Sequence, residues 1–184
     1  MKRELHTARL LLRPPQPGDE HAVFAAWSQD IEVLRYLGWA PHTTLAQTHA
    51  QLNWDQARWL KRSAWTWLLL PRDVHGAPTP IGMVQLVPQQ LDGPPHHLRL
   101  GYLLARPAWG QGWMREALTA VLDETGAHPS VARVDALCDL DNPASIGLLQ
   151  TLGFAQEGVL RRHTRHPNVS DSPRDVAVLA RIRG

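Results

Sequence analysis

The sequence predicts a mixed α/β (α+β) fold, a mixed sheet with flanking helices. The order of elements carries this prediction. A first strand, a helical region and a pair of strands occupy the first half of the chain, and the second half alternates strand, helix, strand, helix and strand. This order is typical of helices packed on a mixed sheet. Because 184 residues suffice for one domain with its own core, we expect residues 1–184 to form a single domain.

Local patterns place the elements of the first half. The apolar run 5–13 reads as a strand, and Asp19 after a Pro-Gly turn reads as the cap of a helix that reaches Ser28. Thr44 with Gln47 forms a capping box for a helix that ends near residue 62. The other expected elements are a helical run over 30–37 and two strands over 64–71 and 81–87, joined by the loop 72–80.

The second half is more regular. After the loop 88–95, a strand is expected over 97–105 and a helix over 113–125, where apolar residues recur at helical spacing. The remaining expected elements are a strand over 131–138, a helix over 143–152, an extended run over 154–160, a loop over 161–173 and a strand over 175–181.

The turn between strand 97–105 and helix 113–125 is the most informative stretch. It reads Trp-Gly-Gln-Gly-Trp over 109–113. Glycines let the backbone approach an anion closely, and the free N–H groups of a helix's first turn point at it. A nucleotide P-loop is excluded because Gly112 is followed by Trp-Met rather than Lys-Ser/Thr, and a dinucleotide fingerprint because its third glycine position is Arg115. A turn without a ligand is the alternative.

A second signature follows the strand 131–138. Asn142 is a good N-cap, Pro143 suits the first helical position, and Gly153 suits the C-terminal cap before Phe154. By itself this is only a well-capped short helix.

Together, the two signatures resemble the acyl-CoA-binding half of the GCN5-related N-acetyltransferase (GNAT) superfamily. The resemblance covers nearly the whole chain and is strongest to the RimJ/RimL-like ribosomal-protein N-acetyltransferases. It rests on the opening run 7–14, on Gly101-Tyr102-Leu103-Leu104 before the glycine turn, and on Asn142 with Leu152-Gly153-Phe154. It implies a GNAT fold: a twisted, mostly antiparallel sheet whose central strands, ending at residues 105 and 138, splay apart.

The resemblance also implies the ligand and its site. Acetyl-CoA is the expected cosubstrate, with pantetheine in the splayed gap and a backbone N–H near Leu103 or Leu104 polarising the thioester carbonyl. The residues expected at the acetyl-CoA site are Leu103, Leu104, Trp109, Gly110, Gln111, Gly112, Trp113, Asn142 and Ser145. Tyr36 and Trp39 are the expected acceptor-binding residues, with core packing as the alternative for Trp39.

The candidate catalytic residues depart from the pattern of the GNAT superfamily. Many GNAT enzymes have a tyrosine acid seven residues after the motif Asn, but this position is Leu149. Ser145 matches the serine proposed in its place in the RimJ/RimL-like group, the alternative being a first-turn helix residue. A frequent family glutamate is replaced by Arg99, which leaves the general base open among His96, His97, His163 and His166. An N-terminal amine, with a pKa of about 7.7–8.0, needs little help from a base.

Composition excludes several classes. A formal net charge of +2 lacks the clustered excess typical of a nucleic-acid binder. No run is long enough for a signal peptide or a membrane span, and no His/Cys/Asp spacing suggests a metal site. The single cysteine, Cys138, permits no intrachain disulfide and suits the cytoplasm. The oligomeric state is open, although homodimers are common among similar enzymes.

Three functions fit these observations. The first is a cytoplasmic, acetyl-CoA-dependent N-acetyltransferase that transfers the acetyl group directly to a primary amine such as a protein N-terminus. The second is an acetyltransferase for a small-molecule amine, for which carboxylates are expected in the acceptor pocket. Only Asp30 and Glu32 are candidates for these. The third is a non-catalytic acyl-CoA-binding module, which the missing tyrosine and glutamate would suit.

Overall fold

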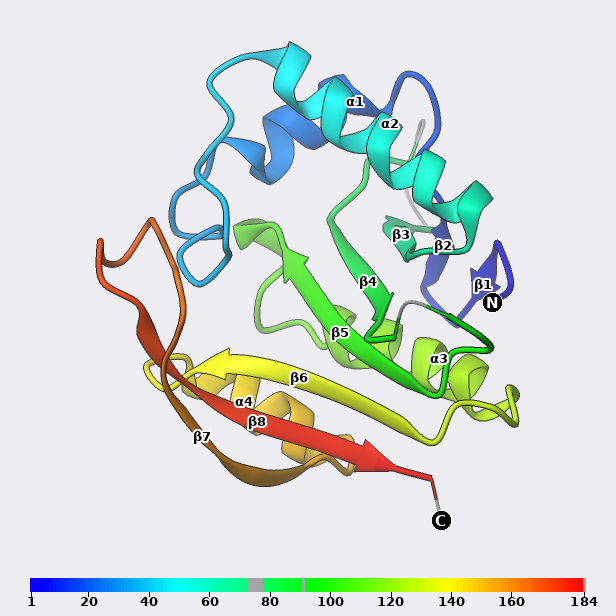
Figure 1. The fold of residues 1–184 in the computed structure, drawn as a ribbon. Coiled ribbons are helices and arrows are strands. Elements are labelled where there is room, and N and C mark those ends of the chain that lie inside the picture. The colour runs from blue at the N-terminus through cyan, green and yellow to red at the C-terminus, as the bar shows by residue number, and fades with distance from the viewer. Residues whose placement is uncertain (73–77, 91, 184) are drawn as a thin grey trace.

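The structure is a computed structural model that describes residues 1–72, 78–90 and 92–183. Over these residues, eight strands form one sheet in the order β1-β2-β3-β4-β5-β6-β8-β7 (Figure 1). The strands are β1 (Leu5–His6), β2 (Leu10–Arg13), β3 (Trp65–Pro71), β4 (Gly82–Pro88), β5 (His97–Leu104), β6 (Arg133–Asp139), β7 (Ala155–Thr164) and β8 (Arg174–Ile182). The helices are α1 (Asp19–Val23), the π-helical turn η1 (Phe24–Ser28), α2 (Leu45–Lys61), the 3₁₀ turn η2 (Arg106–Ala108), α3 (Trp113–Gly126) and α4 (Pro143–Thr151).

The predicted fold class and the splayed strand pair are confirmed. Among the strand pairs described, β5 and β6 are the one parallel pair, and every other pair is antiparallel. The pairing between β5 and β6 covers three residue pairs, from His97 with Arg133 to Arg99 with Asp135. Beyond that point the two strands diverge, and Figure 1 shows the gap opening toward the side where the 28–44 loop and the β7–β8 connection lie.

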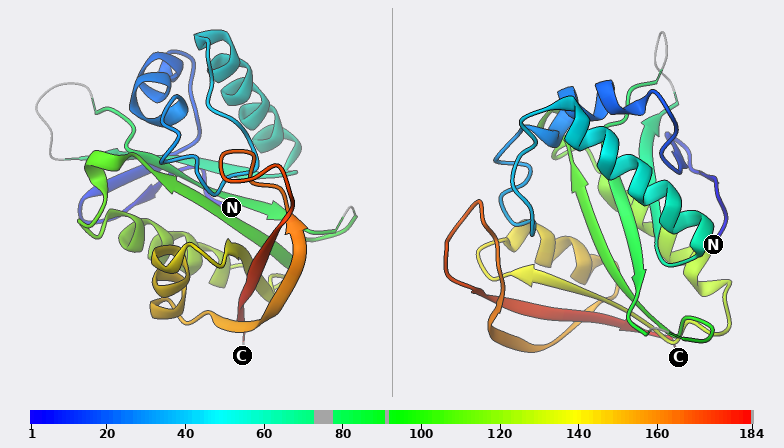
Figure 2. Two further views of the ribbon diagram at one scale, coloured as in Figure 1. Left: turned by 90° about the vertical axis from the view of Figure 1, so that its left-hand side faces the viewer. Right: turned by 45° about the horizontal axis from the view of Figure 1, so that its top comes forward.

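Helices cover both faces of the sheet. The left view of Figure 2 shows α1 and α2 on one side and α3 and α4 on the other. The larger core packs Leu118 and Val121 of α3 and Leu149 of α4 against apolar side chains of the sheet. The smaller core joins Trp27 and Leu52 to strand residues that include Leu103. Strands β2 to β5 thus contribute side chains to both cores, whereas β6 and β8 contribute only to the larger one.

Several elements differ from the sequence prediction. The expected strand 5–13 is two short antiparallel strands, because the Thr7 hydroxyl accepts from the Leu10 N–H and makes a turn. The N-cap residue of α1 is Gly18 and not Asp19, the residue that the sequence predicted. The Asp19 carboxylate instead accepts two hydrogen bonds from Arg13.

The expected helix over 30–37 is a series of turns. Strand β7 extends to Thr164, into the region expected to be loop. The capping box at Thr44 is confirmed, since Gln47 Oε1 accepts from the Thr44 N–H. Parts of the expected loops 72–80 and 88–95 lie outside the described residues.

An ion pair closes the end of the gap where β5 and β6 still pair. Arg99 donates two hydrogen bonds of 3.0 Å to the buried carboxylate of Asp135, and His97 Nε2 lies 2.9 Å from the same carboxylate. Burial alone would raise the pKa of Asp135, but the bonds from Arg99 outweigh it and hold the pKa below its usual value. Arg99, which replaces the family's frequent glutamate, is therefore a structural partner of Asp135.

This arrangement predicts the effect of removing the carboxylate. Asp135→Ala leaves Arg99 without its buried partner, so we expect the free energy of unfolding in urea to fall by about 2 kcal/mol. The matched control is Glu157→Ala, which breaks the more exposed pair with Arg133 and should lower the free energy of unfolding by less. Equal losses in the two variants would contradict the assigned role of Asp135.

Candidate functional site

A cavity of about 590 Å³ occupies the gap between β5 and β6. Its walls come from the two diverging strands, the glycine turn, the start of α4 and the loop before α2. It is lined by residues 32–33, 35–37, 100–104, 109–110, 114, 136–139, 141–145 and 148. The structure thus brings residues from both motifs of the sequence to one cavity.

The edge of β5 offers free backbone groups to this cavity. The Ala105 N–H bonds to Ile81 O and Gln89 N–H bonds to His97 O, so the odd-numbered residues of β5 pair with β4. Because pairing alternates along a strand, Tyr102 and Leu104 direct their backbone groups into the gap. The Leu104 carbonyl accepts from Trp109 Nε1 at 2.6 Å. Of the two residues predicted here, Leu104 has the N–H that faces the gap, whereas Leu103 faces β4.

The glycine turn has the predicted backbone geometry. Gly110 and Gly112 have φ of 73° and 77°, the left-handed region that favours glycine. Gly112 is the N-cap residue of α3, which begins at Trp113, so the free N–H groups of the first turn lie directly after the glycines.

Arg9 holds this turn from the side, which the sequence did not indicate. Its guanidinium lies 4.1 Å from the centre of the Trp113 ring. It donates to Gln111 O at 3.2 Å and to Glu116 at 2.6 Å. Gln111 and Trp113 consequently face a second hollow beside Arg9, while Trp109 and Gly110 line the main cavity.

The start of α4 carries the predicted serine into the cavity. Asn142 Oδ1 accepts from the Ser145 N–H at 3.2 Å, which confirms Asn142 as the N-cap. The Ser145 hydroxyl lies 2.7 Å from the Tyr102 hydroxyl and 3.3 Å from Cys138 Sγ. Burial raises the pKa values of both the Tyr102 phenol and the Cys138 thiol, so both groups stay protonated near neutral pH. Leu149, at the family's tyrosine position, is fully buried in the core.

The open end of the gap is bordered by two loops. Tyr36 lines the cavity and donates its hydroxyl hydrogen to Asp141 O at 2.7 Å. Asn168, on the β7–β8 connection, donates to the carbonyls of Leu34 and Trp39. Trp39 itself packs on the smaller core and stacks on His42, outside the cavity lining. The structure therefore brings Tyr36 to the cavity but not Trp39.

A charged cluster at the end of β6 supports the same loops. The buried Asp139 carboxylate accepts from Arg174 at 2.5 and 2.9 Å, and its Oδ2 lies 2.8 Å from His166 Nδ1. Burial would raise the pKa of Asp139, but the bonds from Arg174, the Asp141 N–H and His166 outweigh it and lower the pKa to about 2. Of the four histidines considered from the sequence, His166 is buried edge-on against Tyr36 at this open end.

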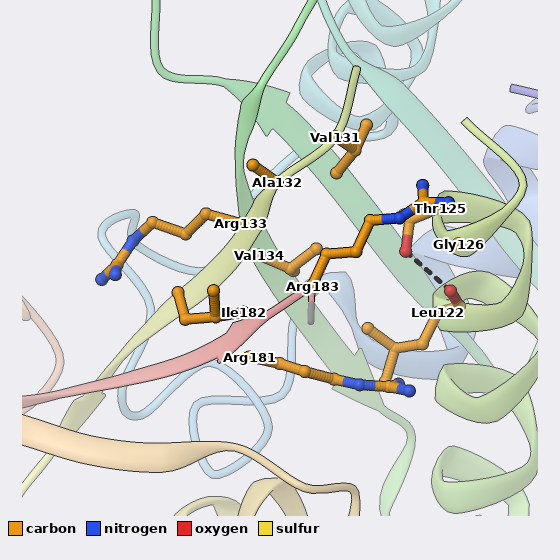
Figure 3. A pocket seen from close by; sticks show the side chains of 10 residues that line it. All are labelled: Leu122, Thr125, Gly126, Val131, Ala132, Arg133, Val134, Arg181, Ile182 and Arg183. Atoms are coloured by element: carbon orange, nitrogen blue, oxygen red, sulfur yellow. Dashed lines mark hydrogen bonds between the residues drawn. The ribbon is translucent and has the colours of Figure 1, made fainter. Parts of the chain in front are cut away.

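A smaller cavity of about 220 Å³ lies at the other end of β6 (Figure 3). It is bounded by the end of α3, the start of β6 and the end of β8, and its neighbours include Arg133, Arg181 and Arg183. Figure 3 shows the Arg133 side chain directed away from it, consistent with the pair that Arg133 forms with Glu157. No residue predicted from the motifs lines it, so we assign the functional site to the larger cavity.

Comparisons with known proteins agree with this geometry. The family model "Acetyltransferase (GNAT) domain" matches residues 9–155. The chain belongs to the GNAT acetyltransferase family. Among curated proteins, the uncharacterized N-acetyltransferase YoaA of Bacillus subtilis is 29% identical over 159 residues, 86% of each chain.

Solved structures share the fold at lower identity. RimL, the ribosomal L7/L12 alpha-N-protein acetyltransferase in complex with coenzyme A, has a TM-score of 0.84 at 19% identity, with 97% of each chain covered. Spermidine N-acetyltransferase from Vibrio cholerae, in complex with CoA and spermine, has a TM-score of 0.78 at 16% identity, with 96% of each chain covered. These likenesses show that the chain has the fold of these enzymes, in agreement with the GNAT acetyltransferase family model.

Two further observations concern the described residues only. Among them, no group of three or more His, Cys, Asp and Glu residues is arranged to hold a metal ion. None of their helices has the length and apolar character needed to cross a membrane.

The Asp139 cluster predicts a pH dependence of stability. Its pKa is about 2 in the folded protein and about 3.9 in an unfolded chain, so the stabilisation is present above pH 4 and is lost as the pH falls from 4 to 2. We expect Asp139→Asn to lower the free energy of unfolding by about 2 kcal/mol at pH 7 and to leave little difference from wild type at pH 2. Urea unfolding at several pH values measures this difference, and a constant difference between the two proteins would contradict it.

Proposed function

We propose that this protein transfers the acetyl group of acetyl-CoA directly to a primary amine, with a protein N-terminus as the favoured acceptor. The observation that carries the proposal is the cavity between β5 and β6, which joins the glycine turn, an unpaired strand edge and Ser145 in one space. The cysteine in this cavity, Cys138, is a free thiol, which suits a reducing compartment such as the cytoplasm. The structural similarity to RimL, which is described as an alpha-N-protein acetyltransferase, supports this acceptor class and the RimJ/RimL-like subgroup.

The residues present suit acetyl-CoA. Residues 110–113 and the first turn of α3 offer backbone N–H groups to its pyrophosphate, whereas the Trp109 N–H donates to Arg106 O. Gly110 and Gly112, whose φ is positive, have no side chain to obstruct this approach. The free edge of β5 offers backbone partners to the amides of pantetheine. Asn142 contributes to the site indirectly, because its side chain caps α4 and so fixes the position of Ser145.

The chemistry requires few ionisable groups. The Leu104 N–H is suited to bind the oxygen of the thioester carbonyl, where negative charge develops during attack. The amine approaches from the open end beside Tyr36. About half or more of an N-terminal amine is already neutral near pH 8, so loss of its proton to water is sufficient. Ser145 donates a hydrogen bond to the leaving sulfur.

The charges at the open end favour an acceptor with a single amine. Each described carboxylate that lines the cavity has an arginine partner: Glu32 has Arg35, while Asp139 and Asp141 share Arg174. Asp30, the other candidate from the sequence, binds Arg106 at 2.6 Å. A polyamine would have to displace these guanidinium groups to find a counter-charge.

Two other functions remain as alternatives. Acetylation of a small-molecule amine is supported by the fold shared with spermidine N-acetyltransferase, and it differs only in the acceptor. A non-catalytic acyl-CoA-binding module would bind the same ligand without turnover. The hydroxyl pair of Tyr102 and Ser145 inside the cavity favours catalysis over this module.

Blocking the glycine turn tests the acetyl-CoA site. Gly110→Val places a branched side chain where the backbone must approach the pyrophosphate, so we expect the Kd for acetyl-CoA to rise at least about tenfold, measured by calorimetry well below the Tm. The control is Gly126→Ala at the other end of α3, where a Cβ meets no atom within 4 Å. Unchanged affinity in Gly110→Val would mean that the pyrophosphate lies elsewhere.

An acceptor screen tests the proposed substrate class. With acetyl-CoA in excess, we expect release of CoA thiol with peptides that have a free N-terminus, and at least about tenfold lower kcat/KM with spermidine, because no unpaired carboxylate attracts its charges. N-terminally blocked peptides that contain lysine are the control. Preference for spermidine would favour the small-molecule function, and binding without turnover on any amine would favour the module.

A further inference from the structure

Three polar atoms meet at the point where the strands diverge. Tyr102 comes from β5, Cys138 from β6 and Ser145 from α4, and all three line the cavity. The Tyr102 hydroxyl lies 2.7 Å from Ser145 Oγ and 3.4 Å from Ser145 O, and Cys138 Sγ lies 3.3 Å from Ser145 Oγ. Ser145 is therefore held between partners from both walls of the gap.

The protonation state of Tyr102 determines how the pair is arranged. Burial raises the pKa of the phenol, so it remains a hydrogen-bond donor throughout the neutral range. A phenol has one hydrogen, and its shorter contact is with Ser145 Oγ. When Tyr102 donates to this oxygen, the hydrogen of Ser145 is free to point to a third atom.

We propose that Tyr102 is a positioning residue for acetyl transfer, which donates to Ser145 Oγ and thereby directs the Ser145 O–H toward the leaving sulfur. The proposal rests on the proposed function. The amine lone pair forms the new C–N bond, and the C–S bond breaks with its electron pair on sulfur. Ser145 stabilises this thiolate through a hydrogen bond, the amine proton passes to water, and the thiolate takes a proton from water.

The position of Tyr102 explains how the chain acts without the usual tyrosine. Leu149 cannot donate a hydrogen bond, and it is buried in the core. Tyr102 brings a phenol to the gap from β5, the wall opposite α4. The backbone of Tyr102 also faces the gap, so the strand that offers its edge to the ligand carries the group that orients Ser145.

The test compares Tyr102→Phe, Ser145→Ala and the double variant. For acetyl transfer to a peptide N-terminus, we expect Ser145→Ala to lower kcat about 100-fold and Tyr102→Phe about tenfold, with the KM for acetyl-CoA within about twofold of wild type. Because Tyr102 acts through Ser145, the double variant should be no slower than Ser145→Ala. Thr151→Val, which removes an exposed hydroxyl from the end of α4, is the control and should leave kcat unchanged.

The outcomes separate a role of Tyr102 that acts through Ser145 from one that does not. Equal slowing by Tyr102→Phe in the wild-type and Ser145→Ala backgrounds would show a role independent of Ser145 and overturn the proposal, as would an unchanged kcat. A wild-type protein that binds acetyl-CoA but acetylates no amine overturns the proposed function and this inference together.

A second measurement serves if Tyr102→Phe fails to fold. The chain has two tyrosines, so difluorotyrosine can replace both with little change of shape, and a Tyr36→Phe background leaves only Tyr102 labelled. Fluorination lowers the pKa of the phenol, and an ionised phenol cannot donate. We expect kcat to fall at a lower pH than in the unlabelled Tyr36→Phe protein, and identical pH profiles of these two proteins would overturn the proposal.

Discussion

The short pairing between β5 and β6 is the constraint on which the rest of the structure depends. Three residue pairs hold the two strands together, and past Arg99 each strand has one edge without a neighbour. Backbone N–H and C=O groups at such edges require partners, and those inside a protein are seldom left without them. The gap is therefore suited to an extended amide-bearing molecule that would replace the missing strand partner. The glycine turn and α4 then stand at its two sides.

Charged groups, rather than apolar packing, hold the gap at both ends. Asp135 binds Arg99 where the strands still pair, and Asp139 binds Arg174 and His166 where β6 ends. Asn168 joins the two loops at the open end through the carbonyls of Leu34 and Trp39. An apolar side chain could fill a gap but could not fix the direction of a strand edge, whereas bidentate hydrogen bonds do. The cost is that both carboxylates must stay ionised, which links the shape of the site to pH.

The sequence predicted the features that depend on neighbouring residues. The Asn142 cap, the capping box at Thr44 and the left-handed glycines at 110 and 112 follow from residue types within a few positions. The wrong prediction for residues 30–37 involves partners far apart in the chain. Residues 30–37 do not form a helix, in a region where Asp30 binds Arg106 and Leu34 is buried.

The site residues that the sequence did not indicate also depend on partners far apart in the chain. Arg9 reaches Glu116 across 107 positions, and Tyr102 reaches Ser145 across 43. The central motif indicated a ligand contact only for the backbone of that strand, although the motif includes Tyr102. Its side chain became relevant only when the sheet brought α4 opposite to it.

The division between backbone and side-chain contacts has a consequence for specificity. The groups suited to the donor are mainly backbone N–H groups of residues 104 and 110–113, which many sequences can supply if the glycines are kept. The groups at the open end are side chains on loops, such as Tyr36 and His166, whose identity can change without disturbing the sheet. A fold built this way can keep its acyl donor while its acceptor varies, so the choice of acceptor depends on the charges at the open end rather than on the fold.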